Sequence, residues 1–417
     1  MNSPAMQQLL RTMRQSSIIR FFEHFAELFP DAHLKDLTVE EILPDRQMVI
    51  NGRLITNFGS DSFLGLDQDP RVLQAIRQGL DRWGSHNGTS RAFSSVRSNL
   101  EAEEKIAAWL GTEASVIFPS VTLANMGAIP ALVGKLDLLV IDEQGHNSIQ
   151  EGAKIAKANG TRVVSFSHCD PAALDKVLRE AAPYRVAVVA IDGVYSMSGE
   201  IPPLAELNRV AQASNAVLYI DDAHASGVVG TKGRGTVLDA LGSYDNTLVI
   251  GSLSKGFSCA GAFIGCSHEM KRLLKMRSTT YLFGGPVVPP YLDAICVVCD
   301  ILNSGEYELL ATRLQANLQR LNQGLHRLGY RFQGGVSPIV SVFVGDEEAT
   351  LQAGRFLFEN GYYVQSVTFP AVPYHAGVLR IQINANHTSA SIDGLVNVLG
   401  QLPSIIDMPR EEQRLVA

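Results

Sequence analysis

The chain of 417 residues has few cysteines, a modest share of charged residues and no long apolar run. Five cysteines, an odd and sparse number, do not describe a disulfide-stabilised fold. No apolar stretch reaches the roughly 18–20 residues that cross a bilayer. The net charge is −7 and no basic block is present, which argues against a nucleic-acid-binding protein. Because 46% of the residues are hydrophobic, disorder is excluded as the main state.

The first 29 residues also lack the basic-then-apolar layout of a secretory signal. Leucine, isoleucine, methionine and phenylalanine recur there at helical spacing, which indicates an amphipathic helix. We therefore expect a cytoplasmic protein without a transmembrane segment.

Two of the cysteines, Cys296 and Cys299, have the spacing of a redox or zinc motif. They lie in the apolar segment 291–302, where residues three apart share one face of a helix. No second cysteine or histidine pair stands nearby to complete a metal site. We interpret both thiols as core residues and expect no metal site.

Short runs rich in valine and isoleucine alternate with helical segments from about residue 100 to residue 264. Such runs are typical of strands buried on both faces, so an α/β fold with a mostly parallel central sheet is expected. After about residue 300 the pattern is that of a smaller α+β unit. We predict an N-terminal helical arm (1–55), a large domain (56–298) and a small C-terminal domain (299–417).

Polar residues follow several of the predicted strands, and in open parallel sheets ligands bind beyond the carboxyl ends of the strands. Two motifs stand out, Val217–Gly227 with Asp221 and His224, and Val249–Gly256 with Lys255. A lysine there suits a Schiff base with pyridoxal 5'-phosphate (PLP), and a buried carboxylate would keep the pyridine nitrogen protonated. Taken singly, Lys255 would be interpreted as a surface lysine, Asp221 as a helix-capping or turn residue and His224 as a structural histidine. Their joint occurrence in this order favours a cofactor site.

Further motifs occur in order along most of the chain: Asn57–Leu66, Asp142–Ser148, Asp192–Gly199, Ser337–Val340 and Leu379–Thr388. With them the chain resembles the α-oxoamine synthases, fold-type I PLP enzymes that include serine palmitoyltransferase, 8-amino-7-oxononanoate synthase and 2-amino-3-ketobutyrate CoA ligase. The resemblance implies the fold-type I architecture, with PLP as cofactor.

The resemblance also implies roles around the cofactor ring. Lys255 would carry the Schiff base and move the Cα proton, and Asp221 would pair with the pyridinium nitrogen. His224 would hydrogen-bond the phenolic oxygen with help from Ser196, and His146 would stack on the ring. Alone, His146 would be interpreted as a helix-capping residue.

Other residues are implied in phosphate and substrate binding. Ser252 would donate to the phosphate, and Arg380 would form a bidentate pair with the amino-acid carboxylate, although alone it would be interpreted as part of a surface ion pair. The family's Ser-Gly-aromatic phosphate segment is Ser120-Val121-Thr122 here, still followed by a helix N-terminus.

Two more departures concern the substrate entrance and the subunit interface. Asp61 stands where the family has asparagine. Gly284 and Gly285 stand where the family has hydroxyl residues that reach the neighbouring subunit's phosphate, so contacts there would come from backbone N–H groups. These changes affect the expected substrate more than the expected reaction.

The activity implied is a decarboxylative Claisen-type condensation of an amino acid with an acyl thioester of CoA or a carrier protein, giving an α-oxoamine, CO₂ and free thiol. A homodimer with shared active sites is implied as well. Two alternatives stay open, another fold-type I reaction such as transamination or aldol cleavage, and a catalytically degenerate partner subunit.

Overall fold

The computed structural model describes residues 3–29 and 37–410. The predicted N-terminal arm and C-terminal domain also include residues 1–2, 30–36 and 411–417, which lie outside the described residues.

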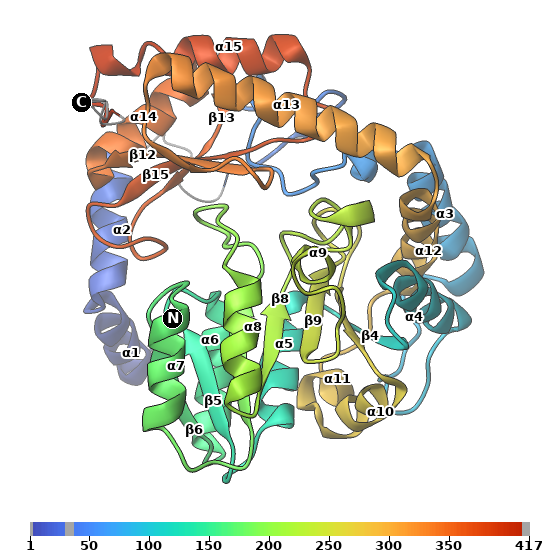
Figure 1. Cartoon of the computed structure of the whole chain (residues 1–417). Helices are drawn as coiled ribbons and strands as arrows, with labels where there is room; N and C mark the ends of the chain where they lie inside the picture. Colours follow the sequence, from blue (N-terminus) through green and yellow to red (C-terminus); the bar gives the residue numbers. More distant parts are fainter. Residues whose placement is uncertain (1–2, 30–36, 411–417) are drawn as a thin grey trace.

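A sheet of seven strands forms the centre of the large domain, in the order β4-β10-β9-β8-β7-β5-β6 (Figure 1). Its strands are β4 (Ala114–Phe118), β5 (Leu138–Asp142), β6 (Arg162–Phe166), β7 (Ala187–Asp192), β8 (Ala216–Asp221), β9 (Thr247–Ser252) and β10 (Ala262–Cys266). All neighbours are parallel except those of β10, which runs antiparallel to both β9 and β4. The α/β fold expected from the valine- and isoleucine-rich runs is confirmed, and β4, β5, β7 and β10 are buried at every residue and β9 at all but its first.

Helices cover both faces of this sheet and enclose two apolar clusters. One cluster lies against α5 (Val121–Leu132), α6 (Asn147–Ala158), α10 (His268–Arg277) and α11 (Thr279–Phe283). The other lies against α4 (Arg97–Leu110), α7 (Pro171–Glu180), α8 (Leu204–Ala213), α9 (Thr236–Leu241) and α12 (Pro289–Asn303), with α3 (Pro70–Trp83) packed beside α12. The second cluster continues into the C-terminal part of the chain, so the two domains share apolar packing.

The small domain is an antiparallel sheet covered by helices. Its strand order is β11-β12-β15-β14, with β11 (Phe332–Gly334), β12 (Ile339–Gly345), β14 (Gln365–Val367) and β15 (Gly377–Gln382). The helices are α13 (Glu306–Leu328), α14 (Glu347–Glu359) and α15 (Ser389–Leu399). Residue 298, where we drew the domain boundary, lies within α12.

The prediction of a helical N-terminal arm is correct for α1 (Pro4–Arg14) and α2 (Ser17–Leu28). It is wrong for the described residues that follow them. Those form β1 (Glu41–Leu43), β2 (Gln47–Ile50) and β3 (Arg53–Asn57), and β3 pairs with β13 (Tyr362–Tyr363) of the C-terminal part. The reason is local turn chemistry, since Asn51 and Gly52 both have positive φ between β2 and β3.

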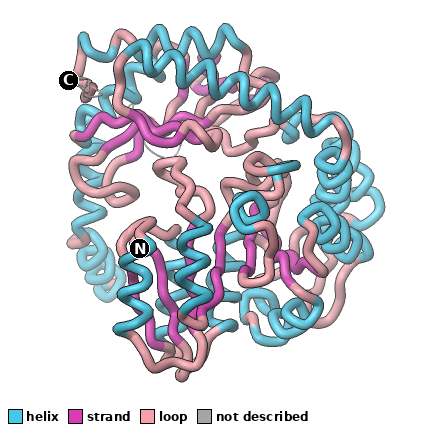
Figure 2. The backbone as a smooth tube through the Cα atoms, viewed as in Figure 1, coloured by secondary structure: helices cyan, strands magenta, loops and turns pink. Residues whose placement is uncertain are grey.

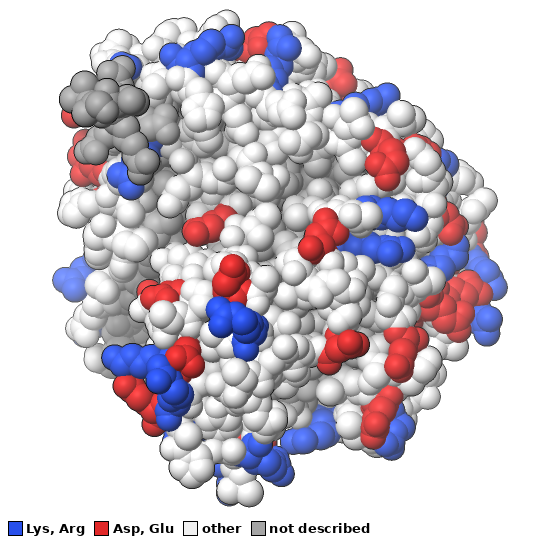
Figure 3. Space-filling model, in the orientation of Figure 1, with Lys and Arg blue, Asp and Glu red and all other residues white. Residues whose placement is uncertain are grey.

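This topology places the site between the two sheets. The large-sheet strands point with their carboxyl ends toward the small domain (Figure 1). The two sheets lie on opposite sides of the centre of the molecule (Figure 2). On the face shown in Figure 3, acidic and basic side chains are interspersed. None of the described helices is long and apolar enough to cross a membrane.

Candidate active site

A cleft of about 1280 Å³ opens between the two domains. Among the residues that line it are six that the sequence predicted for the site: Asp61, His146, Ser196, His224, Lys255 and Arg380. They come from the strand ends of the large domain, from the segment after β3 and from β15 of the small domain. Residues more than 300 positions apart in the chain therefore meet at one cavity.

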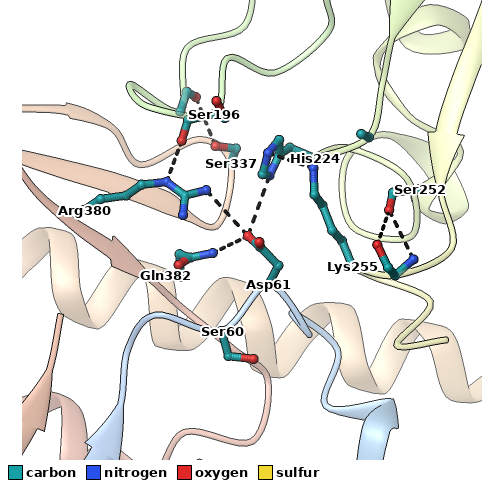
Figure 4. A network of polar contacts seen from close by, with 12 residues as sticks. Ser60, Asp61, Ser196, His224, Ser252, Lys255, Ser337, Arg380 and Gln382 are labelled. Atoms are coloured by element: carbon teal, nitrogen blue, oxygen red, sulfur yellow. Dashed lines mark hydrogen bonds and ion pairs between the residues drawn. The ribbon is translucent and has the colours of Figure 1, made fainter. Parts of the chain in front are cut away.

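Lys255 follows β9, and its amine points toward the neighbouring His224, which follows β8 (Figure 4). The Lys255 Nζ lies 2.9 Å from His224 Nε2. Burial lowers the pKa of Lys255 below its usual 10.5, and Arg380 lowers it further, while Asp61 and Asp221 act in the opposite direction. Burial also holds the pKa of His224 well below 6.5, so a neutral imidazole faces the lysine amine.

Asp221 ends β8 and is buried behind the cleft wall. Its Oδ2 accepts a hydrogen bond of 2.6 Å from Asn125 Nδ2, and its Oδ1 accepts one from the backbone N–H of Ala223. The Tyr219 hydroxyl in turn donates to Asn125 Oδ1 at 2.8 Å. Asn125, three residues after Thr122 in α5, was not predicted as a site residue from the sequence.

His146 caps the N-terminus of α6, with its Nδ1 at 2.7 Å from Ser148 Oγ. Its backbone N–H donates to Asp192 Oδ1, at the end of β7. Burial lowers the pKa of His146 and raises that of Asp192 well above its usual value, with Asp221 adding to the rise at Asp192. The imidazole of His146 faces the cleft without a charge at neutral pH.

Arg380 is buried in the middle of β15 and is held by three segments. Its Nε donates to the Ser196 backbone oxygen at 2.5 Å, and its Nη1 donates to Gln365 Oε1 at 2.6 Å. Its Nη2 lies 3.5 Å from Asp61 Oδ1 (Figure 4). Gln382 also donates to that carboxylate oxygen. Gln365 and Gln382 were missed in the sequence, because β-strand glutamines carry no signal of their own.

The residues predicted to bind the phosphate are not among the described residues that line this cleft. They are Ser120, Val121, Thr122, Ser252, Gly284 and Gly285. Ser120 caps α5, where its Oγ accepts from the backbone N–H of Leu123. A Cβ placed on Gly284 would lie 3.4 Å from the Leu123 side chain, so Gly284 is beside the first turn of the same helix. Ser252 Oγ lies 3.0 Å from Ser254 Oγ at the end of β9.

The donor set fits a PLP group. A lysine with a lowered pKa stands beside two neutral histidines, and a buried carboxylate lies behind them. Among the described residues, His224 Nδ1 is buried without a hydrogen-bond partner; Asp61 Oδ1 is 3.8 Å away. A helix N-terminus at α5 is suited to an anion such as a phosphate.

Comparison with known proteins shows the family to which the chain belongs. The family model for aminotransferase class I and II matches residues 54–399. The chain belongs to this family. The 8-amino-7-oxononanoate synthase of Thermoanaerobacter pseudethanolicus is 33% identical over 375 residues, 89% of this chain and 93% of the relative. The corresponding enzyme of Treponema denticola is 33% identical over 377 residues, with 89% and 93% covered.

Solved structures give the same assignment. Serine palmitoyltransferase from Sphingomonas wittichii superposes with a TM-score of 0.87 at 26% identity, covering 94% of this chain and 99% of that one. A structure of serine palmitoyltransferase with PLP superposes with a TM-score of 0.86 at 27% identity, covering 93% and 98%. This chain is therefore a fold-type I PLP-dependent enzyme of the α-oxoamine synthase family, and the predictions of family, fold and cofactor are confirmed.

Proposed function

We propose that the enzyme condenses an amino acid with an acyl thioester of CoA or a carrier protein and releases CO₂, free thiol and an α-oxoamine. The observation that carries this proposal is that the amine of Lys255 and the guanidinium of Arg380 face one cleft from two domains. The first group suits proton transfer at Cα, and the second suits a substrate carboxylate. The relatives named as oxononanoate and palmitoyl-transferring enzymes support an acyl substrate.

In this proposal Lys255 carries the PLP, Asp221 pairs with its pyridinium nitrogen, His224 and Ser196 contact the phenolic oxygen, and His146 stacks on the ring. Bound PLP supplies an electron sink that makes the Cα proton of an amino acid acidic. Asn125 keeps the Asp221 carboxylate oriented from behind. Phosphate binding falls to a separate group of residues: Ser120, Val121, Thr122 and Ser252.

Each side chain of the cleft has a separate role in the proposed reaction. Arg380 binds the amino-acid carboxylate, and its contacts with Ser196 and Gln365 fix the plane of the guanidinium. The neutral Lys255 amine accepts the Cα proton and later returns one, which its lowered pKa favours. Lys255 and His224 donate hydrogen bonds to the oxygen that gains charge when the acyl group is attacked.

Asp61 is the departure from the family's sequence pattern that most affects which substrate binds. Its carboxylate lies 3.5 Å from Arg380 and offsets part of the positive charge there. We propose that Asp61 binds substrate at the entrance and favours an amino acid that brings a further hydrogen-bond donor.

We also propose a cytoplasmic homodimer of three-part chains, an arm, a large domain and a small domain. In it the turn at Gly284 and Gly285 contributes to the partner's phosphate site through the backbone N–H of Gly285, since the N–H of Gly284 donates to Thr280 O at 2.9 Å. A fully active monomer in analytical ultracentrifugation would contradict this arrangement.

The test of the reaction is incubation of the PLP-loaded enzyme with a panel of amino acids and acyl thioesters, with mass detection of products. We expect CO₂ and free thiol to appear in equal amounts for at least one pair. A keto acid formed without thioester would identify an aminotransferase instead. Absence of every product together with absence of a visible absorbance band that depends on Lys255 would identify a degenerate subunit.

A further inference from the structure

A chain of buried hydrogen bonds leads from Asp221 to His146 behind the wall of the cleft. Its middle is the side-chain amide of Asn125, whose Nδ2 donates to Asp221 Oδ2 at 2.6 Å and to Ser148 Oγ at 2.8 Å. Ser148 Oγ in turn lies 2.7 Å from His146 Nδ1. Asn125, Ser148 and Asp221 are each at most 4% exposed, so bulk water does not compete for these contacts. The proposed reaction gives Ser148 no role.

The direction of each hydrogen bond follows from the groups at its two ends. An ionised carboxylate can only accept, so the NH₂ group of Asn125 faces Asp221 and its oxygen faces Tyr219, whose hydroxyl donates at 2.8 Å. The second N–H of the same amide donates to Ser148 Oγ. The hydroxyl proton of Ser148 is therefore available to His146 Nδ1.

The backbone of Ser148 decides which nitrogen of the His146 ring carries the proton. The N–H of Ser148 also points at His146 Nδ1, at 3.2 Å, and a backbone N–H can only donate. A proton on Nδ1 would set two N–H groups against each other, so Nδ1 accepts and the proton of the neutral ring is on Nε2. The N-terminus of α6, with its partial positive charge, lies at the same nitrogen and opposes a charge there.

The ring of His146 lines the cleft, and among the described residues none hydrogen-bonds its Nε2. Burial lowers the pKa of His146; Asp221 raises it, and Lys255 lowers it again. The titratable groups that face the ring are Asp192 at the end of β7, Asp221 at the end of β8, His224 and Lys255. The two donors at Nδ1 therefore act together with burial to keep the ring neutral.

We propose that Ser148 is a positioning residue that holds His146 as the Nε2–H tautomer, and that Asn125 links this state to Asp221. His146 then offers one hydrogen-bond donor to the cleft while it stays uncharged. The tautomer does not depend on which substrates are condensed. Its use, a hydrogen bond to an oxygen of a substrate, rests on the proposed function, so the first measurement is made without turnover.

The test uses the full-length, PLP-loaded enzyme in which histidine carries an NMR-active nitrogen isotope. His146→Gln identifies the two His146 signals by their loss. In the unmodified enzyme at neutral pH, we expect a protonated Nε2 and an unprotonated Nδ1. A protonated Nδ1, or signals averaged between the two tautomers, would overturn the proposal even if no variant of Ser148 folds.

Ser148→Ala removes the hydroxyl donor to Nδ1 and so removes support for the neutral ring. We expect the midpoint at which Nδ1 takes up a proton to rise by about 0.5–1 pH unit, which corresponds to the loss of one neutral hydrogen bond. Ser148→Thr keeps a hydroxyl and should restore the midpoint. Ser165→Ala, at an exposed position on β6, is the matched control and should leave it unchanged. A midpoint that does not rise in Ser148→Ala would overturn the role of Ser148.

Kinetics then test the use of the donor. In the condensation assay we expect kcat/KM for the amino acid to fall about five- to tenfold in Ser148→Ala and to recover in Ser148→Thr. The expected tautomer in an enzyme that forms no α-oxoamine would contradict the proposed function and leave the tautomer in place. Unchanged kcat/KM in Ser148→Ala with a raised midpoint would overturn the use of the Nε2–H toward the substrate.

Discussion

The two sides of the cleft are built in different ways. On the large-domain side, Lys255, His224 and His146 lie in the turns that follow strands β9, β8 and β5 of one sheet. On the small-domain side, Arg380 is held by contacts to Ser196 after β7, to Gln365 of β14 and to the segment that contains Asp61. The first side is fixed by a single sheet, whereas the second depends on the two domains being together. We therefore expect substitutions on the first side to act on the chemical step and those on the second to act on substrate binding.

The largest effect should come from Lys255→Ala, which removes the proton-transfer group. We expect kcat to fall by roughly 10³-fold or more, together with loss of the visible absorbance band of the PLP-loaded protein. Product formation with mass detection and a visible spectrum measure both. Lys157→Ala, at an exposed position on α6, is the matched control and should change neither. Retention of the band in Lys255→Ala would mean that another residue carries the cofactor.

The same amine offers a pH test in the protein freed of PLP. Because burial lowers the pKa of Lys255, its amine is neutral, and so nucleophilic, at pH values where an ordinary lysine is still charged. The rate at which trinitrobenzenesulfonate modifies Lys255, followed by peptide mass mapping, should rise with a midpoint below pH 10.5. A midpoint at or above that value would mean that the cleft does not favour the neutral amine.

Arg380→Lys tests the other side of the cleft. It keeps a positive charge but loses the planar fork that binds a carboxylate by two hydrogen bonds. We expect KM for the amino acid to rise about 10–100-fold, corresponding to the loss of a charged hydrogen bond, with a much smaller change in kcat. Steady-state kinetics at saturating thioester separate the two parameters, and Arg320→Lys on the exposed face of α13 is the control. A fall in kcat with unchanged KM would break the proposed division between the two sides.

Asn125→Ala tests whether Asp221, on the large-domain side, needs its hydrogen-bond partner. It removes the donor to Asp221 and leaves the buried Tyr219 hydroxyl without its acceptor. An unsatisfied buried polar group costs about 1–3 kcal/mol, so we expect a lower melting temperature of the PLP-free protein. We also expect kcat to fall about tenfold, the change that about 1.4 kcal/mol produces. Unchanged kcat would show that Asp221 does not need this partner.

The smallest effect should come from Ser341→Ala in β12. The Ser341 hydroxyl donates to the Met197 backbone oxygen and so joins the small domain to the loop after β7. Loss of one neutral hydrogen bond costs about 1 kcal/mol, and we expect a rise of about fivefold in KM with kcat unchanged. Ser391→Ala, at an exposed position on α15, should have no effect on either parameter. A larger effect on kcat than on KM would mean that this contact acts on the chemical step.

Most of the large domain could be predicted from the sequence because its strands are buried on both faces and are therefore continuous apolar runs. The alternation of helices with buried strands from about residue 100 to residue 264 was expected, and β4, β5 and β7 within it are buried at every residue. The segment 41–57 was not expected to form strands, since its three strands are short and two of them have exposed residues. The strand β13, which pairs with β3, lies about 300 residues further along the chain, and no local sequence pattern indicates such a contact.

The sequence by itself determined the fold class and the family, because strand-end chemistry and motif order are local properties of the chain. Asp221, His224 and Lys255 could be proposed as a group from the sequence alone for that reason. Only the tertiary structure showed that Asn125 supports Asp221 and Ser148, and that Gln365 and Gln382 surround Arg380 and Asp61. Each of these contacts joins different strands or loops, and their side chains meet because the sheets bring distant segments to the same edge.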